Sequence, residues 1–188
     1  IYSDYQKNKN TNDAKAFLNA IAGTLLTVLF VFTVIVLIFT PIFVLIFAPG
    51  FYIDPLKKDL SIQVLRIMFP YLALMSLVAF AGGIQNTHQK FSVPAFTPVL
   101  FNISLIIAAV FVAPYYDMPI YVLAWGVLLA GFLQLLIQIS PLMNIDRLPV
   151  PKIDFKNKGV KKFITLILPA ILAGGIFQIK LLIDTIFA

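Results

Sequence analysis

The sequence predicts an all-α fold, a bundle of helices that cross a membrane several times. Three observations lead to this class. The 188 residues are 61% hydrophobic and only 12% charged, whereas about 25% of the residues in an average soluble domain are charged. The apolar residues fall into long runs with few or no charges. Each run reaches the roughly 20 residues that a helix needs to cross the hydrocarbon core of a bilayer.

The first three predicted spans follow one another closely. Phe17–Ala48 contains no charged residue. Ile67–Thr87 carries Pro70 in its first turn, where a proline fits because the N–H it lacks would have no helical partner. A short polar turn, Gln85–Ser92, leads into the third span, Pro94–Ala113, which also begins at a proline. The second and third spans are therefore expected to form an antiparallel hairpin.

Two further spans complete the five predicted ones. Ile120–Asn144 carries no charged residue, and the only charged residues of Phe163–Phe187 are a lysine and an aspartate. Between the first and second spans, Pro49–Leu60 is expected to form an external connection, with a short amphipathic lead-in at Ser61–Arg66. Groups of small residues inside the spans are interpreted as points of close helix packing, and helix bending is the alternative. These are Ala79, Ala81, Gly82 and Gly83; Gly126, Ala130 and Gly131; and Ala173, Gly174 and Gly175.

The basic residues are divided unequally between the two sides of the membrane, which predicts the orientation. Positive residues concentrate in cytoplasmic loops, and the side with ten of them includes the N-terminus. The ten are Lys7, Lys9, Lys15, Lys90, Arg147, Lys152, Lys156, Lys158, Lys161 and Lys162, against Lys57, Lys58 and Arg66 opposite. Because these residues lie between apolar runs, the net charge of +6 is assigned to the membrane, and no nucleic acid is expected as a partner.

The segment Asp146–Lys162 is the one loop with the composition of a linker. It has two prolines, a glycine and six basic residues, which fix topology and can also attract anionic lipid headgroups. The predicted organisation is residues 1–145 as part of a first lobe, 146–162 as a cytoplasmic basic linker, and 163–188 as the first helix of a second lobe. The apolar end and the non-methionine start favour an interior piece of a longer protein.

The sequence offers little for enzyme chemistry. It has no cysteine, no glutamate and a single histidine, His88, in a polar turn, where a solvated surface role is the simplest interpretation. Metal sites need several ligands that converge, and no such cluster is visible. We therefore expect no enzyme, no catalytic residue, no resident metal and no cofactor.

Two charged residues inside the fifth span form the best candidate for a functional site. Lys180 and Asp184 are four residues apart and share one helix face. A charge at mid-membrane costs roughly 2.5–3.5 kcal/mol, so such residues usually face a partner or a water-filled cavity. One reading pairs them with each other near the outer interface. The other has Lys180 and Gln178 line a substrate cavity, with Asp184 and Thr185 binding a cation or proton.

The stretch RIMFPYLALMSLVAFAGGIQNTHQKFSVPAFTPVLFNIS, residues 66–104, resembles the MurJ (MviN) family of lipid II flippases, within the multidrug/oligosaccharidyl-lipid/polysaccharide exporter superfamily. The fourth span, at Leu123-Ala124-Trp125 and Gly131 to Leu135, and the final segment LPAILAGGIFQIKLLIDTIFA resemble it too. The resemblance implies about fourteen helices in two lobes, of which this chain supplies helices three to seven. Asp184 falls where some members have an acidic residue of a sodium site, and Lys180 departs from the small polar residue expected there.

The function implied by this resemblance is transport of lipid II, the lipid-linked peptidoglycan precursor, across the bacterial cytoplasmic membrane by alternating access, for peptidoglycan biosynthesis. Lipid II and membrane lipids would be the partners, and a sodium ion or proton the coupling ion. The alternatives are another lipid-linked oligosaccharide or drug exporter of the superfamily, or a membrane-embedded polyprenyl-phosphate transferase. The transferase would need acidic catalytic residues at the cytoplasmic face, and the loops contain only scattered aspartates.

Overall fold

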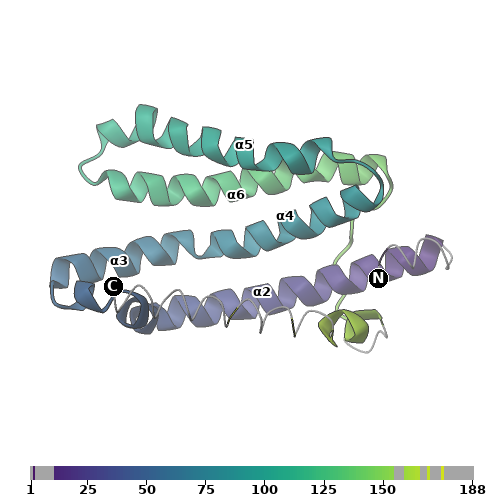
Figure 1. Cartoon of the computed structure of the whole chain (residues 1–188), viewed down its shortest axis with the longest axis horizontal. Coiled ribbons are helices and arrows are strands. Elements are labelled where there is room, and N and C mark those ends of the chain that lie inside the picture. The colour runs from purple at the N-terminus through teal and green to yellow at the C-terminus, as the bar shows by residue number, and fades with distance from the viewer. Residues whose placement is uncertain (1, 3–10, 155–158, 166–168, 170–174, 176–188) are drawn as a thin grey trace. The chain divides into compact units, whose positions relative to one another are not determined.

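The structure is a computed structural model that describes residues 2, 11–154, 159–165, 169 and 175. The all-α class is confirmed, because every regular element among these residues is helical (Figure 1). The chain divides into two compact units, residues 1–24 with 149–188, and residues 25–148. Four helical stretches in the described part are long and apolar enough to cross a membrane. Most of the fifth predicted span lies outside the described residues.

Helix α2 (Thr11–Phe47) contains the first predicted span and bends near its far end. The backbone of Phe39 leaves the helical region (φ −92°, ψ 15°) two residues before Pro41. Pro41 has no N–H to donate to the carbonyl of Leu37, four residues earlier. The hydroxyl of Thr40 lies 2.8 Å from the Val36 carbonyl oxygen and 3.0 Å from the Leu37 carbonyl oxygen, so its single proton is shared between the two. This hydroxyl partly replaces the hydrogen bond that the Leu37 carbonyl loses at Pro41.

The connection after α2 contains more helix than the sequence analysis predicts. Within the expected external connection Pro49–Leu60, a short 3-10 turn, η1 (Pro49–Tyr52), is followed by α3 (Pro55–Met68). The cause is Asp54, whose carboxylate accepts from the backbone N–H groups two and three residues later at 3.0 and 3.4 Å and so caps the helix. The expected amphipathic lead-in is thus the second half of α3.

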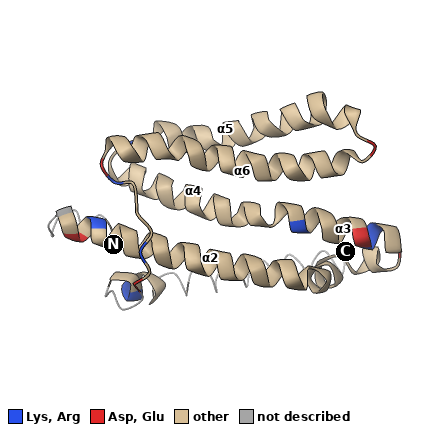
Figure 2. Cartoon of the chain, turned by 180° about the vertical axis from the view of Figure 1, so that it is seen from behind, with Lys and Arg blue, Asp and Glu red and all other residues tan. Residues whose placement is uncertain are grey.

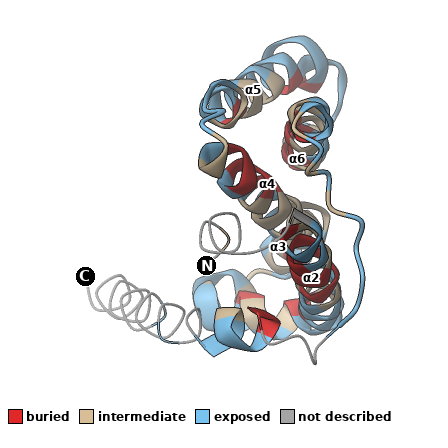
Figure 3. Ribbon diagram, turned by 90° about the vertical axis from the view of Figure 1, so that its right-hand side faces the viewer, coloured by how far each residue is buried: buried red, intermediate tan, exposed pale blue. Residues whose placement is uncertain are grey.

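Helices α4 (Pro70–Thr87), α5 (Ser92–Ile107) and α6 (Pro119–Asn144) form a group within the second unit. They confirm the second, third and fourth predicted spans. Helix α6 packs against both α4 and α5, and the buried residues of α4 and α6 lie where these helices face their neighbours (Figure 3). Beyond α5 the chain continues through a π-helical stretch, η2 (Ala108–Val112), and a 3-10 turn, η3 (Ala113–Tyr115).

Small residues allow this close packing, as the sequence analysis predicts. A β-carbon at Gly131 would lie 2.8 Å from the Tyr71 ring, and one at Gly126 would lie 2.8 Å from the β-carbon of Ala108. Both distances are too short for an ordinary contact, so α6 approaches α4 and the end of α5 through its glycines. Gly83 differs, because a β-carbon there would meet no atom within 4 Å.

Charged residues are confined to the ends of this helix group. Helices α4, α5 and α6 contain none, and Figure 2 shows the lysine, arginine and aspartate residues of this group at the turns. One set of turns carries Lys90, Asp146 and Arg147, and the other carries Asp117. This pattern is typical of helices that cross a hydrocarbon layer. Which set faces the cytoplasm remains a prediction from the count of basic residues.

Candidate functional site

The residues that the sequence analysis selects lie outside the described part of the structure. Lys180 and Gln178, predicted to line a substrate cavity, and Asp184 and Thr185, predicted to bind a cation, all fall in residues 176–188. Their roles stay predictions.

The first half of the basic linker is described and packs on α2 within the first unit. Asn19 accepts there from the backbone N–H of Val150 through its side chain (2.8 Å) and from that of Lys152 through its carbonyl (2.9 Å).

The described residues contain a different candidate, a cluster of four buried polar side chains where α4, α5 and α6 meet. We call it the glutamine cluster: Gln85 from α4, Thr97 from α5, and Gln134 and Gln138 from α6. Their exposed fractions are 0%, 3%, 1% and 1%. Polar side chains at membrane depth normally face the interior of a bundle and bond across helices. Here they do so from three helices at once.

A continuous chain of hydrogen bonds joins the members of the glutamine cluster. The amide nitrogen of Gln85 donates to the amide oxygen of Gln138. The amide nitrogen of Gln138 donates to the Thr97 hydroxyl at 3.1 Å, and that of Gln134 donates to the Thr97 backbone carbonyl at 2.9 Å. The Thr97 hydroxyl itself donates a hydrogen bond to the Val93 carbonyl one turn earlier, at 3.0 Å. The cluster therefore ties α4 to α6 and α6 to α5.

Helical spacing explains why these side chains meet. Gln134 and Gln138 are four residues apart and share one face of α6. Gln85 lies two residues before the end of α4, and Thr97 five residues after the start of α5. The antiparallel turn between α4 and α5 brings both to the level of α6. The backbone N–H of Lys90 donates to the Gln85 carbonyl at 2.9 Å and closes this turn.

Sequence reasoning missed the glutamine cluster, although a signal was present. It assigned Gln85 to a polar turn, and Gln134 entered only as part of the family resemblance. Two glutamines at spacing four inside an otherwise apolar span are a recognisable pattern. The partners on α4 and α5 could not be chosen from the sequence, because that choice depends on how the helices are rotated.

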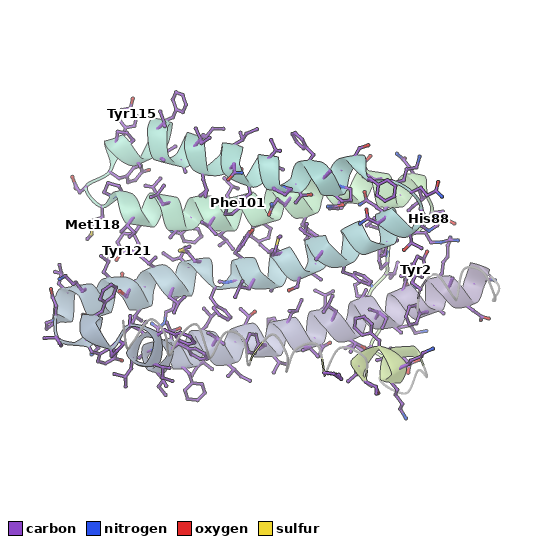
Figure 4. The ribbon with its side chains drawn as sticks, in the orientation of Figure 1. Tyr2, His88, Phe101, Tyr115, Met118 and Tyr121 are labelled. Carbon is purple, nitrogen blue, oxygen red and sulfur yellow. The ribbon has the colours of Figure 1, made fainter. Side chains whose placement is uncertain are left out.

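The turn beside the cluster holds the only histidine of the chain (Figure 4). His88 follows the end of α4 and is half-buried rather than fully solvated. Burial, and next the positive charge of Arg147, lower the pKa of the His88 imidazole below its ordinary value. The imidazole is therefore neutral at physiological pH. Gln89 takes a left-handed backbone conformation (φ 58°), which lets the chain reverse direction into α5.

At the opposite end of the helices, an apolar groove lies between the end of α5, the π-helical stretch and α6. Its volume is about 580 Å³, and Tyr116, Tyr121 and Trp125 are among its lining residues. The Tyr121 hydroxyl donates to the side-chain oxygen of Gln63 on α3 at 2.6 Å. Tyrosine and tryptophan concentrate where membrane meets water, so this end has the residues of a membrane interface.

The chemistry of the glutamine cluster is hydrogen bonding between neutral groups. The glutamine cluster has no ionisable side chain, and no group of three or more His, Cys, Asp or Glu side chains occurs in the part of the chain that was described. Neutral amides can hold helices together and can exchange hydrogen bonds with water when helices move. The glutamine cluster is thus suited to holding α4, α5 and α6 together.

Comparison with known proteins gives consistent matches. The family model described as lipid II flippase MurJ matches residues 1–188. A probable lipid II flippase MurJ of Buchnera aphidicola (subspecies Acyrthosiphon pisum) is 39% identical over 188 residues, covering 100% of this chain and 37% of the relative. The lipid II flippase MurJ of Burkholderia cenocepacia is 38% identical over 184 residues, covering 95% and 36%. That of Haemophilus influenzae, named as probable, is 34% identical over 195 residues, covering 100% and 38%. The chain thus spans less than two-fifths of these curated relatives.

Proposed function

The chain belongs to the MurJ family of lipid II flippases, and from that membership we propose that its protein moves lipid II across the bacterial cytoplasmic membrane. The observation that carries the proposal is the match of the family model to all 188 residues. The described helices, which make the chain part of a multi-pass membrane protein, agree with it. The N-terminus of this piece lies in the cytoplasm, on the side with more basic residues.

The physical task sets what the whole protein must provide. Lipid II has an anionic pyrophosphate and a long apolar polyprenyl tail. A cavity with cationic and polar groups has to accept the pyrophosphate while the polyprenyl tail stays in the bilayer. Conformations open to either side then exchange, and a bound cation or the membrane potential shifts their populations. We assign Lys180 and Gln178 to the cavity wall, and Asp184 and Thr185 to a site for sodium or a proton.

Transport is tested with the full-length protein, of which this chain is part. Cells depleted of their own flippase should regain growth when they express the full-length protein, and should not when they express residues 1–188 alone. Purified protein in vesicles should make fluorescent lipid II accessible to a reagent on the far side. Vesicles that move another lipid-linked oligosaccharide but not lipid II would overturn the substrate assignment.

Single substitutions test the two assigned sites. Lys180→Gln should slow lipid II movement, whereas Lys162→Gln, an exposed lysine in the linker region, should leave it unchanged. Sodium should raise the thermal stability of the wild-type protein relative to choline, and Asp184→Asn should abolish that increase. Asp117→Asn, in an exposed turn, serves as its control. A sodium effect that persists in Asp184→Asn would exclude Asp184 from the cation site.

A further inference from the structure

The orientation of every amide in the glutamine cluster is fixed by two backbone carbonyls. The Thr97 carbonyl can only accept, so Gln134 must turn its nitrogen toward it. The Thr97 hydroxyl donates its hydrogen bond to the Val93 carbonyl, so it accepts from the nitrogen of Gln138. The oxygen of Gln138 therefore faces α4, and Gln85 must meet it with its nitrogen. While the Thr97 hydroxyl donates to the Val93 carbonyl, no single amide can be flipped without placing two donors or two acceptors together.

This arrangement leaves two amide oxygens without a donor. The side-chain oxygens of Gln85 and Gln134 are buried and have no hydrogen-bond partner among the described residues. Each glutamine amide also carries two N–H bonds and uses only one of them inside the cluster. Buried polar groups of native proteins are almost always bonded to protein or to ordered water. A ligand that both donates and accepts would satisfy both kinds of group.

We propose that the glutamine cluster is a binding site for internal water, which donates to the side-chain oxygens of Gln85 and Gln134 and accepts from the remaining amide N–H groups. Internal waters typically make about three such bonds to buried polar groups. Water suits the cluster better than a cation does, because Gln85, Thr97, Gln134 and Gln138 carry no negative charge to offset the loss of an ion's hydration.

Water has a short route to this site from the membrane surface. Gln85 lies two residues, about 3 Å along the helix, from the end of α4. Gln138 lies six residues, about 9 Å, from the end of α6. Both ends leave the membrane at the polar turns that carry His88 and Arg147. A small separation of α4 from α6 at this end admits water to the cluster.

The test uses the full-length protein in phospholipid vesicles, with its glutamine side chains labelled with nitrogen-15. Solid-state NMR measures how fast magnetisation passes from water to each side-chain amide. The signals of Gln85 and Gln134 are identified by their loss in Gln85→Met and Gln134→Met. Asparagine at the same positions identifies them if a methionine variant does not fold. Exposed Gln89 is the hydrated reference.

The proposal predicts transfer from water to Gln85 and Gln134 at rates comparable to that of Gln89. Signals from both that remain without transfer while Gln89 receives it would overturn it. Replacing sodium or potassium by choline should not shift either signal, because water and not an ion occupies the site. A shift that follows the cation concentration would show an ion site and would also overturn the proposal. Neither result depends on which lipid the whole protein moves.

Discussion

Replacing Gln138 by methionine should destabilise the helix group far more than the same change at Gln134. Gln138 is the link between α4 and α5, because it accepts from Gln85 and donates to the Thr97 hydroxyl. Hydrogen bonds between side chains of membrane helices contribute about 0.6 kcal/mol each on average. The change also leaves the Gln85 amide, which is 0% exposed, with no partner among the described residues, at a cost of about 1–3 kcal/mol. The expected loss is about 2–4 kcal/mol.

Gln134→Met is the matched control, because it removes a side chain of the same length from the same face of the same helix. It loses one hydrogen bond, to the Thr97 carbonyl, and it leaves the links from Gln85 to Gln138 and from Gln138 to Thr97 intact. We therefore expect the stability to stay within about 1 kcal/mol of wild type, because a hydrogen bond of this kind contributes about 0.6 kcal/mol on average.

The measurement is reversible unfolding of the full-length protein by SDS in mixed micelles, followed by helical circular dichroism. The two single variants and the double variant are compared with wild type under one set of conditions. If Gln138→Met costs no more than Gln134→Met, the hydrogen-bond chain does not stabilise the helix group and the reasoning is refuted.

Three further predictions follow from other contacts. Gly131→Ala should destabilise the full-length protein by about 1–3 kcal/mol in the same assay, because the new methyl group meets the α4 side chains. Gly83→Ala, with open space around it, should be neutral or stabilise by up to about 1 kcal/mol. If the two alanine variants change stability equally, close packing of α6 on α4 at Gly131 is contradicted. Gly23→Ala should release the linker from α2, because a β-carbon there collides with the backbone of the linker, and limited proteolysis at residues 149–154 should become faster. Because burial and Arg147 lower the pKa of His88 in the folded protein, the unfolded chain binds more protons. The free energy of unfolding should therefore fall as the pH drops below the ordinary histidine pKa of about 6.5. His88→Asn should make this dependence of stability on pH less steep, and an unchanged dependence would show that His88 does not cause it.

Much of the fold was predictable because the bilayer imposes a strong condition on the sequence. A span must be apolar for about 20 residues, and proline, glycine and charge then mark its ends. The prediction failed at α3, where the local cap at Asp54 starts a helix inside an expected loop. The composition of α3 is far less apolar than that of the spans, so hydropathy alone could not predict that α3 is a helix.

The candidate site was less predictable than the fold. The sequence directed attention to the charges Lys180 and Asp184, which lie outside the described residues. The neutral glutamines were not selected from the sequence, because a single glutamine in a span is compatible with several structural roles. The significance of Gln85 comes from Gln138, which lies 53 positions later, and such a separation leaves no local pattern.

By itself, the sequence determined the helical class, the positions of the described spans and the family, because hydropathy and motif are properties of consecutive residues. The tertiary structure alone decided which faces of α4, α5 and α6 meet. That choice depends on helix rotation and on close approach at residues such as Gly126 and Gly131. It brings Gln85, Thr97 and Gln138 within hydrogen-bonding distance, and so makes a buried polar site from side chains that are unremarkable one at a time.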